Sequence, residues 1–287
     1  MRKFTPLLLL LLLCACAAAQ DKRPAALPEW VEVDSNVPYS EYKQTVVDIL
    51  RPKGPYQGKR PGVIVIHGGG WVRLSKDQLV ASFCIPYLKA GFVVANVEYR
   101  LADVAPAPAA VEDVLRAAHW FRKNAGKYNV DRKRIVVTGA SAGGHLALMV
   151  GMVSRKAKLG PRTKVAAVVN FFGITDVGDQ IEGPNMREYA VKWVPEQPDR
   201  RMLAWRVSPI AYVRKGLPPI LTIHGDADQT VPYEHGFNLT RQLRQVGVDA
   251  EMISIANGRH GLTHEKLVEL HHDRVFEFLR RHRVLKD

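Results

Sequence analysis

The residue with the clearest chemical potential is Ser141, at the centre of the segment GASAGG (residues 139–144). The apolar run IVVT precedes this segment and an apolar stretch follows it, so we expect Ser141 on a sharp turn between a strand and a helix. Such a turn exposes the serine, strains its backbone and needs small flanking residues. The positive end of the following helix also favours a developing negative charge nearby. Ser141 is therefore a candidate nucleophile, and a simple glycine turn is the alternative.

A second segment, HGGGW (residues 67–71), follows the apolar run GVIVI. Glycines let the chain approach a substrate closely, and backbone N–H groups on such a loop stabilise the oxyanion of acyl transfer. The alternative is a flexible or phosphate-binding loop. No Lys-Ser/Thr pair follows the glycines and no G-x-G-x-x-G pattern is present, which disfavours phosphate binding. We assign His67 no catalytic role and expect it to orient the loop by hydrogen bonding.

A serine nucleophile needs a histidine that takes its proton and an acid that fixes the tautomer of that histidine. In the chain order serine, acid, histidine, both partners lie downstream of the serine. The segment HGDADQTVP (residues 224–232) follows the apolar run ILTIH and supplies two acids, and NGRHG (residues 257–261) follows the last expected strand. His260 is therefore the candidate base. The pattern leaves Asp226 and Asp228 as alternative acids.

The other histidines are weaker candidates for the base. His119 and His145 fall within expected helices, and we interpret His264, His271 and His272 as one solvated face of a C-terminal helix. A zinc site made of these last three residues lacks a spaced partner cluster. We therefore predict no metal site.

Apolar, β-branched runs alternate with helical patterns along the chain, which predicts an α/β fold with a mostly parallel central sheet and helices on both faces. The expected strands cover residues 45–50, 62–66, 92–97, 135–138, 165–170, 220–224 and 251–255. The expected helices cover residues 77–90, 109–124, 142–153 and 264–283. Residues 178–206 are rich in charge and are expected to form a small insertion over one end of the sheet.

Together and in order, these motifs resemble the α/β-hydrolase superfamily, specifically its bacterial carboxylesterase branch with an HGGGW loop. The resemblance runs from about residue 45 to residue 279, and its pieces are VIHGGGW, VEYRLA with PAPAAVEDV, GASAGGHLA, SPIAYV, HGDADQTVP and GRHG. It implies that Ser141 is the nucleophile and His260 the base. It implies Asp228 as the triad acid, because the family's HGxxDxxVP loop places the acid four residues after the histidine.

By the same resemblance, the oxyanion hole consists of the backbone N–H groups of Gly69, Gly70 and Ala142. Arg100 and Asp113 match positions that are structural in the family. No metal ion or organic cofactor is implied.

Within the superfamily, the chain departs from the hormone-sensitive-lipase type, which usually carries an acidic residue where this chain has Ala140. The GASAGGHLA segment, taken together with the HGDADQTVP loop, is more similar to esterases of the acetyl-xylan and feruloyl type. The H-G-G-x-W pattern also fits kynurenine formamidases, which act on a cytosolic metabolite. The resemblance thus implies a serine carboxylic-ester hydrolase for short acyl or aryl esters, including acetyl or feruloyl groups on polysaccharides. An arylformamidase-like amide hydrolase and a non-catalytic binding protein are the alternatives.

Trp71, Trp193 and Trp205 are candidate walls of an aryl or sugar pocket, although we interpret each of them first as packing of the core or the insertion.

The first nineteen residues read as a secretory signal, with Arg2 and Lys3, an unbroken leucine run and then Ala17 to Ala19. They predict export to the periplasm or the medium, followed by one catalytic domain over residues 20–287. A bacterial lipobox ending at Cys16 is the alternative, and it would leave a lipid anchor on that residue. Cys84 is then the single cysteine of the mature chain and is expected to be buried.

The chain is basic, with 41 Lys and Arg against 28 Asp and Glu and a formal net charge of +13. No helix-turn-helix, zinc-ligand spacing or RNA-binding signature accompanies this charge, so we predict no nucleic-acid partner. The charge favours acidic polymers or anionic membranes as partners. The oligomeric state is not predicted.

Overall fold

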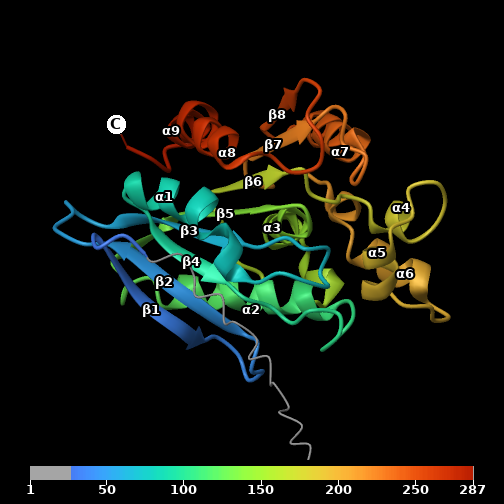
Figure 1. Ribbon diagram of the computed structural model, residues 1–287, viewed down its shortest axis with the longest axis horizontal. Coiled ribbons are helices and arrows are strands. Elements are labelled where there is room, and N and C mark those ends of the chain that lie inside the picture. The colour runs from blue at the N-terminus through green and yellow to red at the C-terminus, as the bar shows by residue number, and fades with distance from the viewer. Residues whose placement is uncertain (1–26, 287) are drawn as a thin grey trace, which may run out of the picture.

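The computed structural model of the chain describes residues 27–286. They form an eight-stranded sheet with helices packed on it (Figure 1). The strand order is β1-β2-β4-β3-β5-β6-β7-β8, in which β2 runs antiparallel to both of its neighbours and all other pairs are parallel. The predicted α/β class and mostly parallel sheet are confirmed. The strands are β1 (Val31–Pro38), β2 (Val46–Pro52), β3 (Arg60–Ile66), β4 (Val93–Val97), β5 (Val130–Ala140), β6 (Ala167–Phe171), β7 (Ile220–Gly225) and β8 (Ala250–Ile255).

Helices cover both faces of this sheet, because alternate side chains of the buried strands point to opposite sides. The α-helices are α1 (Ile85–Lys89), α2 (Ala109–Lys123), α3 (Ala142–Met152), α4 (Val177–Ile181), α5 (Glu188–Trp193), α6 (Arg200–Arg206), α7 (Tyr233–Gln245), α8 (His264–Leu270) and α9 (Phe276–Arg281). Residues of α2, α3 and α7 pack in the core on one face, and residues of α1, α8 and α9 pack in the core on the other. Within residues 27–286, every helix is too short or too polar to span a bilayer.

The predicted elements match the structure with the following exceptions. β1, at one edge of the sheet, was not expected, because only its first residue is buried. Helix α7 was also not expected. The expected helix 77–90 is a succession of the 3-10 helix η1 (Lys76–Leu79), the π-helix η2 (Val80–Cys84) and α1. The expected helix 264–283 is likewise a succession of α8, the π-helix η5 (His271–Val275) and α9. The predicted signal segment and Cys16 lie outside the described residues.

The predicted insertion, residues 178–206, contains most of α4 together with α5 and α6, at one end of the molecule (Figure 1). Trp193 of α5 stacks on Trp71 at a ring-centroid distance of 4.1 Å, and both are fully buried, so they pack the core. Trp205 of α6 is 57% exposed, so its interpretation as a packing residue was wrong.

A buried ion pair fixes the loop after β4 to helix α2. The Arg100 guanidinium donates to both carboxylate oxygens of Asp113, at 2.8 and 2.7 Å, and Asp113 is fully buried. The backbone N–H of Arg100 donates to the same carboxylate at 3.1 Å. This geometry agrees with the structural role that the resemblance implied.

We expect Asp113→Ala to lower the free energy of unfolding by about 3–5 kcal/mol, because it leaves a buried guanidinium without its partner. Glu112→Ala is the matched control, since Glu112 is partly exposed and lies 3.9 Å from the same guanidinium. Its expected cost is at most about 1 kcal/mol. Urea denaturation of both variants measures the difference, and equal costs would contradict the structural role of the buried pair.

One histidine of the C-terminal helix is placed differently from the expectation. His264 and His272 are exposed, but His271 is fully buried in an aromatic cluster. The reason is its spacing: His271 lies four residues after buried Leu267 and therefore on the apolar stripe of the helix. Burial lowers the pKa of His271 to about 4, so the ring is neutral in the folded chain.

We expect this neutral ring to make stability depend on pH. Because the pKa of His271 is lower in the folded chain than in the unfolded one, the unfolded chain binds the extra proton between about pH 6.5 and 4. Stability is full above this window and falls as the pH decreases through it, by up to about 3 kcal/mol for this residue. His271→Phe should flatten the decrease in urea denaturation experiments, whereas exposed His272→Phe should not. A pH dependence that persists unchanged in His271→Phe would refute the assignment.

Candidate active site

Ser141 lies where β5 ends and α3 begins, and its backbone has the strained angles φ 57° and ψ −122°. The backbone N–H of Ser141 donates to the Phe171 carbonyl of β6 at 2.9 Å, which fixes the turn. The glycine at 143 is required by packing, because a Cβ there would lie 2.1 Å from the Ile66 carbonyl oxygen of β3. The turn therefore presents the serine at the carboxyl end of the sheet, as the sequence predicted.

The loops after β7 and β8 bring an acid and a histidine to this serine. Ser141 Oγ donates to His260 Nε2 at 3.0 Å, and His260 Nδ1 donates to Asp228 Oδ2 at 2.7 Å. The two loops touch through their backbones: a Cβ on Gly225 would lie 2.1 Å from the Gly258 carbonyl oxygen. Three residues that are far apart in the sequence thus form one hydrogen-bonded chain.

The Asp228 carboxylate is buried and strongly stabilised in its charged form. Burial raises its pKa, but hydrogen bonds from His224 and His260, the charge of His260 and the backbone N–H of Val231 outweigh that effect and hold the pKa well below its usual range. Its other oxygen accepts from the N–H groups of Thr230 and Val231 at 2.8 and 3.0 Å. Asp228 is therefore ionised at neutral pH and fixed in position.

The structure distinguishes the two acids that the pattern left open. Asp226 accepts a hydrogen bond from the Asn257 N–H at 2.6 Å and closes the turn, whereas the Asp228 side chain is fully buried beside His260. The sequence reasoning missed His224, whose Nε2 lies 3.0 Å from the Val231 carbonyl and 3.3 Å from Asp228. His224 opens the HGDADQTVP motif, so its place four residues before Asp228 was the available signal.

The HGGGW loop lies directly beside the serine. A Cβ on Gly68 would lie 3.5 Å from the Cβ of Ser141. In the part of the chain that the structure describes, the N–H groups of Gly69, Gly70 and Ala142 have no hydrogen-bond acceptor. These are the three donors that the resemblance implied, and they are free to bind an anionic oxygen.

Polar contacts hold this loop in place. His67 Nε2 bonds to the Glu98 carboxylate at 2.9 Å, and Tyr99 donates to the His67 carbonyl at 3.0 Å. Trp71 donates to His145 Nδ1 at 3.2 Å. Burial lowers the pKa of His145 to about 4, so this ring is neutral and accepts the bond. His67 and His145 thus have structural roles, in agreement with the sequence analysis.

The insertion contacts both catalytic loops. A Cβ on Gly70 would lie 2.7 Å from the Tyr189 ring, so α5 packs directly on the HGGGW loop. The Tyr189 hydroxyl donates to Gln180 Oε1 at 2.5 Å, and Arg187 Nε donates to the Thr230 carbonyl of the acid loop at 3.2 Å. These contacts could not be predicted from the sequence, because nothing in the charged segment indicates which loops it touches.

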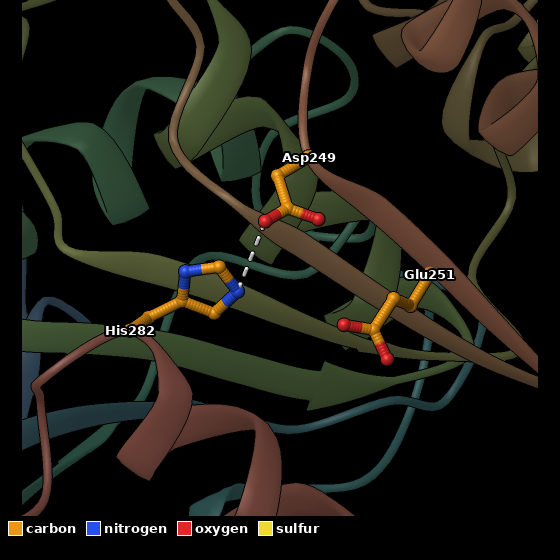
Figure 2. A group of neighbouring side chains, drawn as sticks. All are labelled: Asp249, Glu251 and His282. Carbon is orange, nitrogen blue, oxygen red and sulfur yellow. Dashed lines mark ion pairs between the residues drawn. The ribbon is translucent and has the colours of Figure 1, made fainter.

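Other reactive groups lie outside this site. Cys84 is buried and free, as predicted, and burial raises the pKa of its thiol well above the usual range. Asp249, Glu251 and His282 lie close together at β8 and the end of α9 (Figure 2). Arg281 pairs with Glu251 at 2.7 Å, and His282 lies 3.5 Å from Asp249. These contacts make the group an ion-pair cluster that fastens the C-terminal helix to the sheet edge.

The BD-FAE family model matches residues 47–243 of the chain, a segment that includes the HGGGW loop, Ser141 and Asp228. Among curated proteins, esterase LipC of Mycobacterium tuberculosis is 31% identical over 72% of this chain and 54% of its own length. Esterase LipQ of the same organism is 28% identical over 74% of this chain and 53% of its own length. The chain therefore spans about half the length of these curated relatives.

Solved structures share the fold over a larger part of their length. A truncated carbohydrate esterase from gut microbiota is 28% identical with a TM-score of 0.72, over 88% of this chain and 96% of its own. The apo form of Thermogutta terrifontis esterase 2 is 25% identical with a TM-score of 0.75, over 93% of this chain and 99% of its own.

Proposed function

This chain belongs to the BD-FAE family of α/β-hydrolase-type esterases, and from that premise we propose that it hydrolyses carboxylic esters through Ser141, His260 and Asp228. The observation that carries the proposal is the hydrogen-bonded chain from Ser141 Oγ through His260 to Asp228, next to a loop with free N–H groups. The esterase relatives support the same reaction class.

The proposed reaction has two steps. His260 Nε2 takes the proton of Ser141 Oγ, which attacks the ester carbonyl, and the N–H groups of Gly69, Gly70 and Ala142 hold the oxyanion. His260 then protonates the leaving alcohol and activates the water that releases the acyl group. Asp228 remains ionised throughout and holds His260 in the tautomer that accepts the serine proton. Each oxyanion donor contributes about 10²–10³-fold in rate.

We propose short acyl or aryl esters as substrates, among them acetyl or feruloyl groups on polysaccharides. The support is the similarity to a carbohydrate esterase and the acid-loop pattern of the sequence. Purified chain should hydrolyse p-nitrophenyl acetate or butyrate faster than the octanoate, and it should release acetate from acetylated xylan or ferulate from feruloylated arabinan. Hydrolysis of an aryl formamide without turnover of any ester would favour the amide-hydrolase alternative. No turnover of either class would favour a binding protein.

We also propose that the chain is exported, on the basis of the leader pattern in residues 1–19. Expression of the full chain in a Gram-negative host, followed by fractionation and N-terminal analysis, tests this. A periplasmic product that begins at Gln20 supports free secretion, and a lipidated Cys16 supports an anchored form. An uncleaved cytosolic product contradicts export.

A further inference from the structure

The segment between α3 and β6 has no role in the proposed mechanism. It reads RKAKLGPRTK (residues 155–164) and contains five cations and no acid, namely Arg155, Lys156, Lys158, Arg162 and Lys164. Among the described residues 27–286, none of these cations lies within 4.0 Å of a carboxylate oxygen. This is a concentration of positive charge that the described part of the chain does not neutralise.

Two cavities flank this segment. One, of about 530 Å³, is lined by Arg155, Arg162 and Lys164, and the other, of about 690 Å³, is lined by Lys156, Lys158 and Arg206. Of the residues that the structure describes, those that line the two cavities include no Asp or Glu. We call these six cations the basic patch.

Buried polar groups beside the first cavity add to the local excess of donors. One Arg214 guanidinium nitrogen and the Thr163 hydroxyl are buried and have no hydrogen-bond partner within residues 27–286. The pKa of Arg214 is lowered mainly by burial and to a smaller extent by the nearby charge of Arg162. The like charges repel one another here, so a bound anion would relieve the repulsion.

An exposed aromatic surface adjoins the basic patch. Trp205 and Met202 of α6 line the second cavity and are 57% and 67% exposed, respectively. Arg206 Nε donates to the Ala157 carbonyl at 3.1 Å, which fastens the end of α6 to the basic segment. An exposed indole face beside cations matches a sugar ring that carries a carboxylate, because the ring C–H groups stack on the indole and the carboxylate pairs with the cations.

We propose that the basic patch and Trp205 form a binding site for an acidic polysaccharide, with uronate carboxylates on the cations and a sugar ring on the indole. The proposal rests on the proposed function, since it assigns this enzyme a polymer that carries its ester groups. A polysaccharide chain is favoured over a membrane because the cations line cavities of several hundred Å³, which a polymer chain can enter and a flat bilayer surface cannot. The exposed side chains of Trp205 and Met202 alone would also fit a membrane, so the test below includes vesicles.

This site is separate from the catalytic residues. Ser141 precedes α3 and the basic segment follows it, so the 11 residues of this helix hold the two sites about 16 Å apart. The insertion connects them, because Trp205 lies on α6 while Tyr189 and Arg187 contact the catalytic loops.

The test uses the full chain with the substitution Ser141→Ala, so that binding is measured without turnover. Titration calorimetry with polygalacturonate should show binding, and neutral dextran should show none. Lys158→Gln/Arg162→Gln and, separately, Trp205→Ala should each raise Kd by about tenfold or more, which is about 1.4 kcal/mol. The matched control is Lys89→Gln/Arg280→Gln, which removes the same charge from exposed residues of α1 and α9 on the other face of the sheet and should leave Kd unchanged.

Equal effects of the two charge variants, or an unchanged Kd in Trp205→Ala, would overturn the proposal. So would binding to phosphatidylglycerol vesicles without binding to polygalacturonate, because it would assign the patch to a membrane. With Ser141 restored, the patch variants should hydrolyse p-nitrophenyl acetate at the unaltered rate. If the unmutated chain hydrolysed no ester but still bound polygalacturonate, the proposed function would be refuted and the binding site would not, because binding is measured without turnover.

Discussion

Replacement of Ser141 by alanine is expected to lower kcat for p-nitrophenyl acetate by about 10⁴–10⁶-fold. The reason is that alanine has no oxygen to attack the ester carbonyl, so the acyl-enzyme cannot form. The remaining rate would come from the oxyanion donors and from substrate binding, and KM should change little. Steady-state kinetics on purified protein measure both quantities, and circular dichroism verifies the fold.

A second serine provides the control for this variant. Ser82 Oγ also lies 2.9 Å from a histidine nitrogen, Nδ1 of His264. Ser82 is part of the helix η2, however, and not of a turn between a strand and a helix. Ser82→Ala should therefore retain full activity, and a large loss in Ser82→Ala with little loss in Ser141→Ala would contradict the assignment of the nucleophile.

Asp228→Asn is expected to lower kcat by about 10⁴-fold at neutral pH. An amide at this position offers a neutral side chain to His260, so the histidine is no longer held with its proton on Nδ1 and the charge that forms on it is no longer compensated. Because Asp228 is buried and accepts two backbone N–H bonds, the asparagine should keep its place with a modest loss of stability. Kinetics and thermal unfolding of the same preparation separate the two effects.

Asp226→Asn is the matched control, since it changes the same functional group two residues earlier on the same loop. Asp226 bonds to the Asn257 N–H and not to His260, so we expect at most about a tenfold loss in kcat from a looser turn. Comparable losses in the two variants would mean that the acid has not been identified.

The parallel strands and the order of the motifs could be predicted because they depend on local sequence. Strands β3 to β7 are apolar runs, and glycines or turn residues follow the strands that carry the candidate residues. The choice between Asp226 and Asp228 could not be made from spacing, since both follow the same strand. It depends on the path of the backbone, which turns the Asp228 carboxylate inward onto the N–H groups of Thr230 and Val231.

The errors have a different physical origin. His271 was placed in solvent because its polarity outweighed its spacing from Leu267, although an aromatic cluster can bury a neutral imidazole. Trp205 was interpreted as packing because large aromatic residues are buried on average. Whether a given tryptophan of the insertion is inside depends on how α5 and α6 meet the body of the protein. That information lies in contacts between distant segments.

The measurement that tests the central claim most directly is covalent labelling of the nucleophile with paraoxon, followed by mass spectrometry. The serine oxygen displaces p-nitrophenolate from phosphorus and retains the diethylphosphoryl group. We expect one label per chain, in the tryptic peptide of residues 135–155, which contains Ser141. Loss of ester hydrolysis should parallel its appearance, and His260→Ala should label far more slowly. Labelling of another residue in step with the loss of activity, or ester hydrolysis that persists when Ser141 is fully labelled, would contradict the claim that Ser141 is the nucleophile.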